Sequence, residues 1–458
     1  MEENDIATIT KRSIRGIVAL VSRTFFMRAI SMTTGLLLAA FLSPSTFGVF
    51  YIVSAIIPLL SYFSDIGLAA SLIQKKEEIT QDDLKTTFTI QQGLVITIVI
   101  IALLLSNFVG QFYSLEGVGI YLFQAVVIAF FLSSLKTIPS IILERNLQFQ
   151  KLVIPEIVET LFFNVTVLVL AIQGFGVMSF TYAVLARGIS GLVTIYIIAP
   201  WKISLGISRE SAKKLLSFGI PFQANSFLAL LKDDLLVMYL GKVLPLAQVG
   251  YIGFAQKMAF TPLRLIMDNV IRITFPSFSR LQHDKNSLAV GIEKALLAVS
   301  FFIFPSFFGL ILLSPYAINL IPKFAKWEPA LLSLSFFAIN ATLSSISTPL
   351  TNALNAIGKI KITLYLMIFW TILTWILTPL SILFFGFNGV AGVSAVIASS
   401  VVLVVYIARR YIAFNILKAV KYPFFASILM GTVLYFIRPF LVVNLFTLIL
   451  TILFSAIV

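Results

Sequence analysis

The sequence predicts an all-α membrane protein with about 14 transmembrane helices, and three observations lead to this fold class. Hydrophobic residues make up 59% of the 458 residues, whereas charged residues make up only 11%. The mean hydropathy of +1.02 excludes an ordinary soluble globular chain. The apolar residues gather in stretches of about 20, the length of helix that crosses roughly 30 Å of hydrocarbon.

The first apolar stretch follows an acidic and then basic start, and it is too long for a cleavable signal peptide. We therefore expect it to be the first membrane span. Every stretch is expected to be helical, because a helix closes its backbone hydrogen bonds internally where lipid offers no partners. In chain order the predicted spans are residues 16–42, 46–66, 87–109, 118–140, 152–172, 177–200, 213–241, 246–275, 288–313, 329–356, 361–385, 389–408, 419–437 and 440–457.

Basic residues in the connections set the predicted orientation, because Lys and Arg collect on the cytoplasmic side. Of the 33 basic residues, about 22 lie at the N-terminus and in alternate connections after it. The opposite connections hold only Lys242, Lys323, Lys326 and Arg438. We predict a multi-pass protein of a prokaryotic plasma (inner) membrane with a cytoplasmic N-terminus. The net charge of +14 then reflects topology and attraction to membrane lipids, and it predicts no nucleic-acid partner.

The short connections exclude several classes of function. The longest outer connection, from Ser314 to Glu328, is too short for a catalytic domain, and no cytoplasmic connection is long enough for an ATPase domain. The sequence therefore predicts a protein that is not an enzyme, with a proton or sodium gradient as a candidate energy source. Cysteine is absent and His283 is the single histidine, so we expect neither a cofactor nor a metal site.

Internal repetition indicates two related halves. Residues 42–50 (LSPSTFGVF) connect the first and second predicted helices, and residues 244–252 (LPLAQVGYI) connect the seventh and eighth. The sixth predicted helix begins near residue 176 and the twelfth near residue 389. Each begins with Gly-Val shortly after a Gly-Phe pair. Chance is the alternative, because Gly-aromatic pairs are common at helix ends. Two six-helix units of the same orientation imply two lobes related by a pseudo-twofold axis along the membrane normal.

This repeat divides the chain into four predicted segments. Residues 1–200 form the N-terminal lobe with helices 1 to 6, and residues 201–214 form a cytoplasmic linker. Residues 215–414 form the C-terminal lobe with helices 7 to 12, and residues 415–458 form an additional pair of C-terminal helices.

Basic side chains inside the predicted spans are the strongest functional signal. A charge in hydrocarbon costs at least about 2.5 kcal/mol, so such residues face a bundle interior or a water-filled cavity. They therefore predict the binding of an anionic passenger. Two alternatives stay open, because Arg23 is shallow enough to snorkel and the small neighbours of Arg187 also allow a structural pair. The predicted substrate-binding residues are Arg23, Arg28, Arg187, Lys232, Lys257, Arg264 and Arg272.

Four of the charged residues fall on one face of the eighth predicted helix. At 100° per residue, Lys257, Arg264, Asp268 and Arg272 lie within about 80° of arc, although Pro262 will bend the helix. One interpretation is a cavity wall that binds pyrophosphate and acidic sugars. The other is an Arg264–Asp268 pair that holds helices together, with Arg272 snorkelling inward.

Carboxylates in the spans are candidates for ion coupling or gating. An aspartate of the seventh helix either takes up a coupling ion or neutralises Lys232 and other cations. Glu156 and Glu159 form a similar pair on the fifth helix, while Asp65, at the inner end of the second helix, is a gate, a helix-terminus residue or a coupling site. The predicted set is Asp65, Glu156, Glu159, Asp233, Asp234 and Asp268.

Short motifs between about residues 10 and 410 add a resemblance to a family. They are residues 47–50 (FGVF), 63–74 (FSDIGLAASLIQ), 144–149 (ERNLQF), 217–221 (SFGIP), 233–234 (DD), 313–316 (LSPY), 326–330 (KWEPA) and 352–359 (NALNAIGK). In this order they resemble the polysaccharide transporter family, the O-antigen and colanic-acid type flippases of lipid-linked oligosaccharides. The resemblance implies the fold of the multidrug/oligosaccharidyl-lipid/polysaccharide exporter superfamily, with two lobes in a V that opens alternately to each side.

The resemblance also implies the expected function. It predicts a flippase that moves undecaprenyl-pyrophosphate-linked oligosaccharide repeat units from the cytoplasmic to the outer leaflet for surface polysaccharide assembly, with polysaccharide polymerase machinery as a candidate partner. A multidrug or cation antiporter of the same superfamily is the alternative, but cationic substrates favour a carboxylate-dominated cavity. A membrane-embedded glycan polymerase or ligase is the third candidate function. Such an enzyme would be expected to need a larger exterior loop with positioned acids and bases.

Overall fold

The structure is a computed structural model, and it describes residues 26–75, 77–115, 117–442, 444, 447–448 and 450–451. Arg23, the start of the first predicted span and much of the last one lie outside the described residues. The described chain forms two compact units that divide after Leu246.

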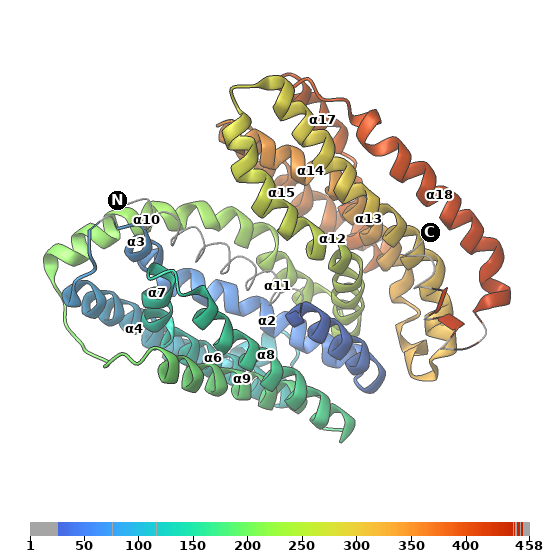
Figure 1. Cartoon of the computed structure of the whole chain (residues 1–458). Helices are drawn as coiled ribbons and strands as arrows, with labels where there is room; N and C mark the ends of the chain where they lie inside the picture. Colours follow the sequence, from blue (N-terminus) through green and yellow to red (C-terminus); the bar gives the residue numbers. More distant parts are fainter. Residues whose placement is uncertain are drawn as a thin grey trace. The chain divides into compact units, whose positions relative to one another are not determined.

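Unit 1 consists of helices, and most of the connections between them are short (Figure 1). A helix over Phe26–Phe41 comes first. It is followed by α2 (Pro44–Asp65), α3 (Leu68–Gln74), α4 (Gln81–Leu104), α5 (Ser106–Phe112), α6 (Gly117–Ser134), α7 (Thr137–Arg145), α8 (Phe149–Ile172), α9 (Val177–Ile198), α10 (Arg209–Lys232) and α11 (Asp234–Val243).

Unit 2 is also helical. It contains α12 (Leu246–Leu281), α13 (Lys285–Leu320), the 3-10 helix η1 (Pro322–Trp327), α14 (Ala330–Ala356), α15 (Ile360–Phe385), α16 (Asn388–Ala398), α17 (Val401–Arg409) and α18 (Ile416–Leu441).

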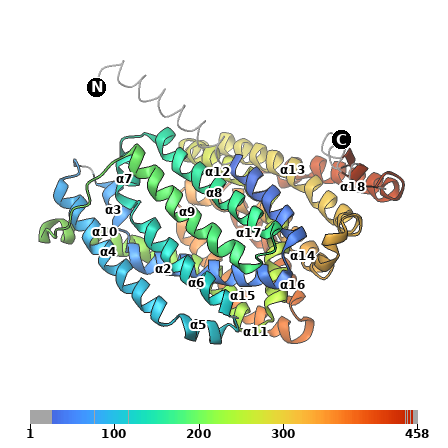
Figure 2. The ribbon, with the colours of Figure 1, turned by 90° about the horizontal axis from the view of Figure 1, so that it is seen from below.

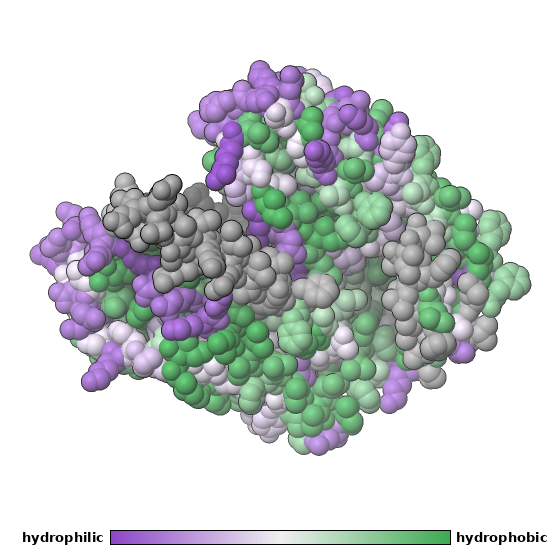
Figure 3. Space-filling model, viewed as in Figure 1, coloured by the Kyte–Doolittle hydropathy of each residue, from purple (hydrophilic) through white to green (hydrophobic). Residues whose placement is uncertain are grey.

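Within the part of the chain that the structure describes, ten helices are long and apolar enough to cross a membrane. Figure 3 shows hydrophobic side chains over the middle of the helices and hydrophilic ones gathered towards their ends, as expected for bilayer-spanning helices. The predicted all-α membrane class is confirmed, while the number 14 stays a prediction. Some predicted spans are divided in the structure, such as 213–241, which is α10 followed by α11.

Several helices begin where a side chain satisfies the first free backbone N–H groups. Thr80 and Asp83 form a reciprocal capping box at the start of α4. Asp284 accepts hydrogen bonds from the backbone at the start of α13, and Asn415 does the same for α18. These caps lie beside the polar segments that the sequence places in connections, so they fix where the apolar helices begin.

The helices of the two units pack in the same order. In unit 1, α9 packs against α8 and α6, and α4 packs against α6 (Figure 2). In unit 2, α16 packs against α15 and α14, and α13 packs against α14. The helices can be numbered by their position in the predicted repeat. In both units the third helix then contacts the fourth, the fourth contacts the sixth, and the fifth contacts the sixth. Finally, α18 lies along α13.

The seventh predicted helix packs within unit 1. Its two parts, α10 and α11, contact α2, α3 and α4, so the boundary between the compact units comes after this helix. The predicted lobe boundary at residues 201–214 rests on the sequence repeat and stays a prediction.

A close backbone approach holds α10 on the break between α2 and α3. Ile66 and Gly67 have φ angles of 39° and 73° at this break, a region that glycine adopts without strain. A Cβ atom on Gly67 would overlap the carbonyl oxygen of Gly219, and one on Gly219 would lie 2.5 Å from the Ile66 carbonyl oxygen. Nearby, Gln223 Nε2 donates to the Tyr62 carbonyl oxygen at 2.9 Å. Two of the sequence motifs therefore meet at this point.

Candidate functional site

The charged face of α12 is the main feature of the candidate site. We define it as Lys257, Arg264, Asp268 and Arg272. The two arginines and the lysine are exposed, and Asp268 is partly buried. The helix runs without interruption from Leu246 to Leu281, so Pro262 does not disturb the phase that places these residues on one side.

The opposite face of α12 packs into the core of unit 2. Leu263 and Met267 are 6% and 4% exposed, and they form a cluster with Val299, Ile303 and Ala341. The charged face therefore points away from this hydrophobic core. It extends over roughly 22 Å from Lys257 to Arg272 at 1.5 Å per residue, which is most of a membrane span. A row of exposed cations of this length is far too costly for lipid, so it requires an aqueous or anionic environment.

The second charged feature is the break in the seventh predicted helix. Lys232 is the last residue of α10, Asp234 is the first residue of α11, and Asp233 lies exposed between them. A cation at a helix C-terminus and an anion at an N-terminus both favour the local helix dipoles. The sequence Lys-Asp-Asp therefore suits a helix that is interrupted within the membrane, and interrupted helices are common around transporter sites.

The third charged feature is a triad in unit 1 that is centred on a mostly buried carboxylate. The side chain of Glu159 on α8 is 11% exposed, and it forms an ion pair with Lys136 between α6 and α7. Its second oxygen lies 3.5 Å from Arg187 Nε on α9, and the Arg187 side chain is 55% exposed. A Cβ atom on Gly191 would overlap the Glu159 carboxylate, so this glycine makes room for it. The sequence left open whether Arg187 forms a structural pair or contacts substrate. The structure contains an ion pair between Arg187 on α9 and Glu159 on α8.

The remaining predicted site residues all belong to unit 1. Arg28 lies in the helix Phe26–Phe41 and is partly buried. Asp65 accepts a hydrogen bond from the Ala69 backbone N–H at 3.2 Å, across the break between α2 and α3. Glu156 is partly buried one turn before Thr160, whose hydroxyl donates to the Glu156 carbonyl oxygen at 2.8 Å. Asp65 therefore has the geometry of a helix-terminus residue.

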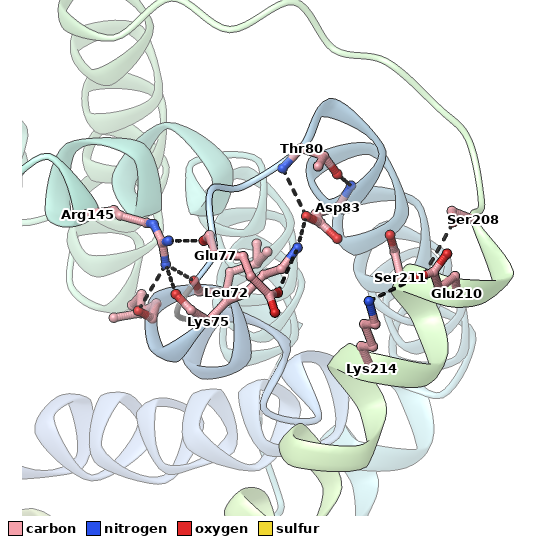
Figure 4. Close-up of polar contacts among 11 residues, drawn as sticks. Leu72, Lys75, Glu77, Thr80, Asp83, Arg145, Ser208, Glu210, Ser211 and Lys214 are labelled. Carbon is pink, nitrogen blue, oxygen red and sulfur yellow. Dashed lines mark hydrogen bonds and ion pairs between the residues drawn. The ribbon is translucent and has the colours of Figure 1, made fainter.

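Sequence reasoning missed the role of Arg145. Its guanidinium donates to the carbonyl oxygens of Leu72 at 3.0 Å and Lys75 at 2.5 Å, and also to that of Glu77 (Figure 4). These carbonyls lie at the end of α3, where a helix leaves acceptors unsatisfied. The motif at residues 144–149 contained the signal, but the partners are about 70 residues away in sequence, which no local periodicity reveals.

The same polar network ties the α3–α4 connection to the start of α4. Lys75 Nζ lies 2.5 Å from Asp83 Oδ2, and Asp83 is almost fully buried. Nearby, the Ser208 backbone N–H donates to Thr86 Oγ1 at 2.9 Å, which holds the segment before α10 against α4. The network anchors the predicted cytoplasmic end of unit 1.

Comparison with known proteins decides the family. A sequence profile of the polysaccharide biosynthesis protein family matches residues 37–331, which is more than half of the chain. The protein belongs to the polysaccharide biosynthesis protein family. Among curated relatives of this family member, the lipopolysaccharide biosynthesis protein WzxC of Escherichia coli (strain K12) is 25% identical over 375 residues, or 80% of this chain and 74% of WzxC.

Solved structures support the fold of this family member. The lipid II flippase MurJ in an inward closed conformation aligns with a TM-score of 0.78 and 17% identity, covering 96% of both chains. An inward-facing multidrug resistance MATE family transporter of the MOP superfamily aligns with a TM-score of 0.66 and 15% identity, covering 86% of this chain and 98% of the transporter. The predicted family resemblance and the predicted superfamily fold are confirmed.

We predict that Glu159→Gln destabilises the protein, because Lys136 and Arg187 lose their shared carboxylate. Breaking a buried ion pair costs about 3–5 kcal/mol, and the exposure of Arg187 reduces the expected loss to about 2 kcal/mol. Thermal unfolding of the purified protein in detergent measures the effect. The matched control is Glu210→Gln, because Glu210 pairs with Lys214 at 2.8 Å but both side chains are exposed. Equal unfolding temperatures for the two variants would remove the structural role of the triad.

Proposed function

We propose that this protein is a flippase that moves undecaprenyl-pyrophosphate-linked oligosaccharide repeat units from the cytoplasmic to the outer leaflet. The observation that carries the proposal is the charged face of α12, with its exposed Lys257, Arg264 and Arg272. In this proposal these side chains bind the diphosphate and any acidic sugars of the passenger. Arginine suits this task because its planar guanidinium binds phosphate oxygens through two parallel hydrogen bonds.

The chemistry of the passenger explains why a row of cations is useful. A diphosphate and several sugars cannot cross hydrocarbon unaided, because desolvating their charges is far too costly. A row of cations replaces water around the diphosphate along its path, while the prenyl chain stays in an apolar environment. Alternating access then releases the head group on the outer side without opening a continuous pore.

The relatives give independent support for this substrate class. The family is one of polysaccharide biosynthesis proteins, WzxC is named as a lipopolysaccharide biosynthesis protein, and MurJ is named as a lipid II flippase. Accordingly we propose that this protein serves surface polysaccharide assembly in a prokaryotic plasma membrane, with a cytoplasmic N-terminus. Polysaccharide polymerase machinery is the proposed partner on the outer side.

A multidrug antiporter is the second candidate, because the MATE transporter has a similar fold. The charged face of α12 argues against a multidrug antiporter. Its three cations outnumber its one carboxylate, so it repels a cationic drug and attracts an anion. A glycan polymerase or ligase would be expected to need positioned acids and bases on the outer side. Across the described residues, the outer connections that contain α5 and η1 are both short, which favours a protein that is not an enzyme.

For energy input we propose that an aspartate at the break between α10 and α11 takes up a proton or sodium ion. We therefore predict that Asp233→Asn or Asp234→Asn makes transport of lipid-linked oligosaccharide independent of the relevant ion gradient, because the coupling charge is lost. Flipping in proteoliposomes with and without an imposed gradient measures this effect. If both variants respond to the gradient as the parent protein does, these residues are not the coupling groups.

For the substrate we predict that Arg264→Ala lowers flipping at least tenfold, because one charge-assisted contact to phosphate contributes about 1.5–3 kcal/mol. The matched control is Lys361→Ala on α15, an exposed lysine of the same unit. Lys75 is unsuitable as a control because it binds the buried Asp83. Surface glycan in cells that depend on this protein, with inserted protein quantified in parallel, measures the loss. Normal surface glycan with Arg264→Ala would contradict the proposed binding role.

A further inference from the structure

The 3-10 helix η1 carries two of the few basic residues that the predicted topology places on the outer face. Lys323 and Lys326 both lie on this short segment between α13 and α14. Lys323 is exposed and Lys326 is partly buried. Outer connections of membrane proteins are depleted of Lys and Arg, so topology does not account for two lysines in six residues.

An aromatic anchor holds η1 on the first turns of α12. Trp327, the last residue of η1, is fully buried. Its ring stacks on Phe254 with centroids 4.2 Å apart and an interplanar angle of 26°. It also meets Tyr251 edge to face at 6.1 Å. Both partners lie on α12, so the position of the two lysines is fixed relative to that helix.

This anchor places η1 at one end of the charged face of α12. Phe254 comes one turn before Lys257, and at 100° per residue it falls within the same arc of the helix as Lys257 and Arg272. From Arg272 to Tyr251 the helix rises roughly 32 Å, which matches the hydrocarbon thickness of a bilayer. The row of cations from Arg272 to Lys257 therefore ends one turn from Phe254, the residue on which η1 packs through Trp327.

The electrostatics of η1 favour an anionic ligand. Burial lowers the pKa of Lys326, and the positive charge of Lys323 lowers this pKa further. Glu328 directly follows η1 and is exposed, so the segment combines two cations with one carboxylate. The repulsion between the two lysines is relieved when an anion with more than one charge binds between them. Lysine is a flexible point charge, and at an exposed rim its contacts are weak enough for release.

We propose that Lys323 and Lys326 form an exit site that receives the diphosphate of the lipid-linked substrate when it reaches the outer leaflet. This inference rests on the proposed flippase function and on the proposed topology. It assigns to η1 a role in substrate release in addition to its packing through Trp327.

The test measures binding of farnesyl diphosphate, a short prenyl diphosphate, to the full-length protein in phosphatidylcholine nanodiscs by calorimetry. We expect the double variant Lys323→Gln/Lys326→Gln to bind about tenfold more weakly, because it loses charge-assisted contacts to phosphate. The matched control is Lys242→Gln, another lysine of the predicted outer face, which lies 4.3 Å from the centre of the Phe112 ring in unit 1. We expect this control to bind as the parent protein does.

A charge-rescue experiment separates binding from a change in fold. The chain has no cysteine, so a thiol introduced as Lys326→Cys is the single target for a thiol reagent. An aminoethyl methanethiosulfonate restores a positive charge at this position and should restore affinity, whereas a sulfonatoethyl reagent of similar size should not.

The outcomes distinguish this inference from the function on which it rests. If Arg264→Ala weakens binding while the double lysine variant binds normally, the exit site is wrong and the proposed substrate class stands. If the parent protein does not bind farnesyl diphosphate, both are wrong. If the double variant changes only the retention of phosphatidylglycerol in mixed nanodiscs, the lysines bind phospholipid headgroups and the exit site is again wrong.

Discussion

The free-energy cost of a charge in hydrocarbon is the constraint on which the rest of this structure depends. It leaves three arrangements for an ionised side chain within a span: contact with an opposite charge, a helix terminus, or water. The protein uses all three. Glu159 is shared between Lys136 and Arg187, Lys232 and Asp234 lie at the two termini of an interrupted helix, and the basic residues of α12 stay exposed.

These arrangements have different functional meaning. The Glu159 triad pairs one carboxylate with two cations within unit 1 and thereby joins α8, α9 and the α6–α7 connection. The interrupted helix places a cation and an anion at two helix termini that face each other across Asp233, and interrupted helices are common around the ion sites of transporters. The face of α12 has three exposed cations and one carboxylate, and a diphosphate is the proposed passenger that such an excess of positive charge would stabilise.

Much of this could be predicted from the sequence, because it depends on local periodicity. The all-α class follows from the length of the apolar stretches, and the phase of Lys257, Arg264 and Arg272 follows from 100° per residue along a helix that Pro262 does not interrupt. Long-range partners could not be predicted in this way. Arg145 meets the end of α3, and Gly67 meets Gly219, through contacts that only the folded chain brings together.

The most direct test of the central claim is whether the charged face of α12 is reached by water from each side of the membrane in turn. Thr261 falls on this face, whereas Met267 is buried in the core of unit 2. The cysteine-free chain allows Thr261→Cys and Met267→Cys to be compared with a membrane-impermeant thiol reagent, in intact cells and in inverted vesicles. The account predicts that Thr261→Cys is labelled from both sides, with lipid-linked substrate shifting the ratio, and that Met267→Cys is labelled from neither. No labelling of Thr261→Cys from either side would contradict it.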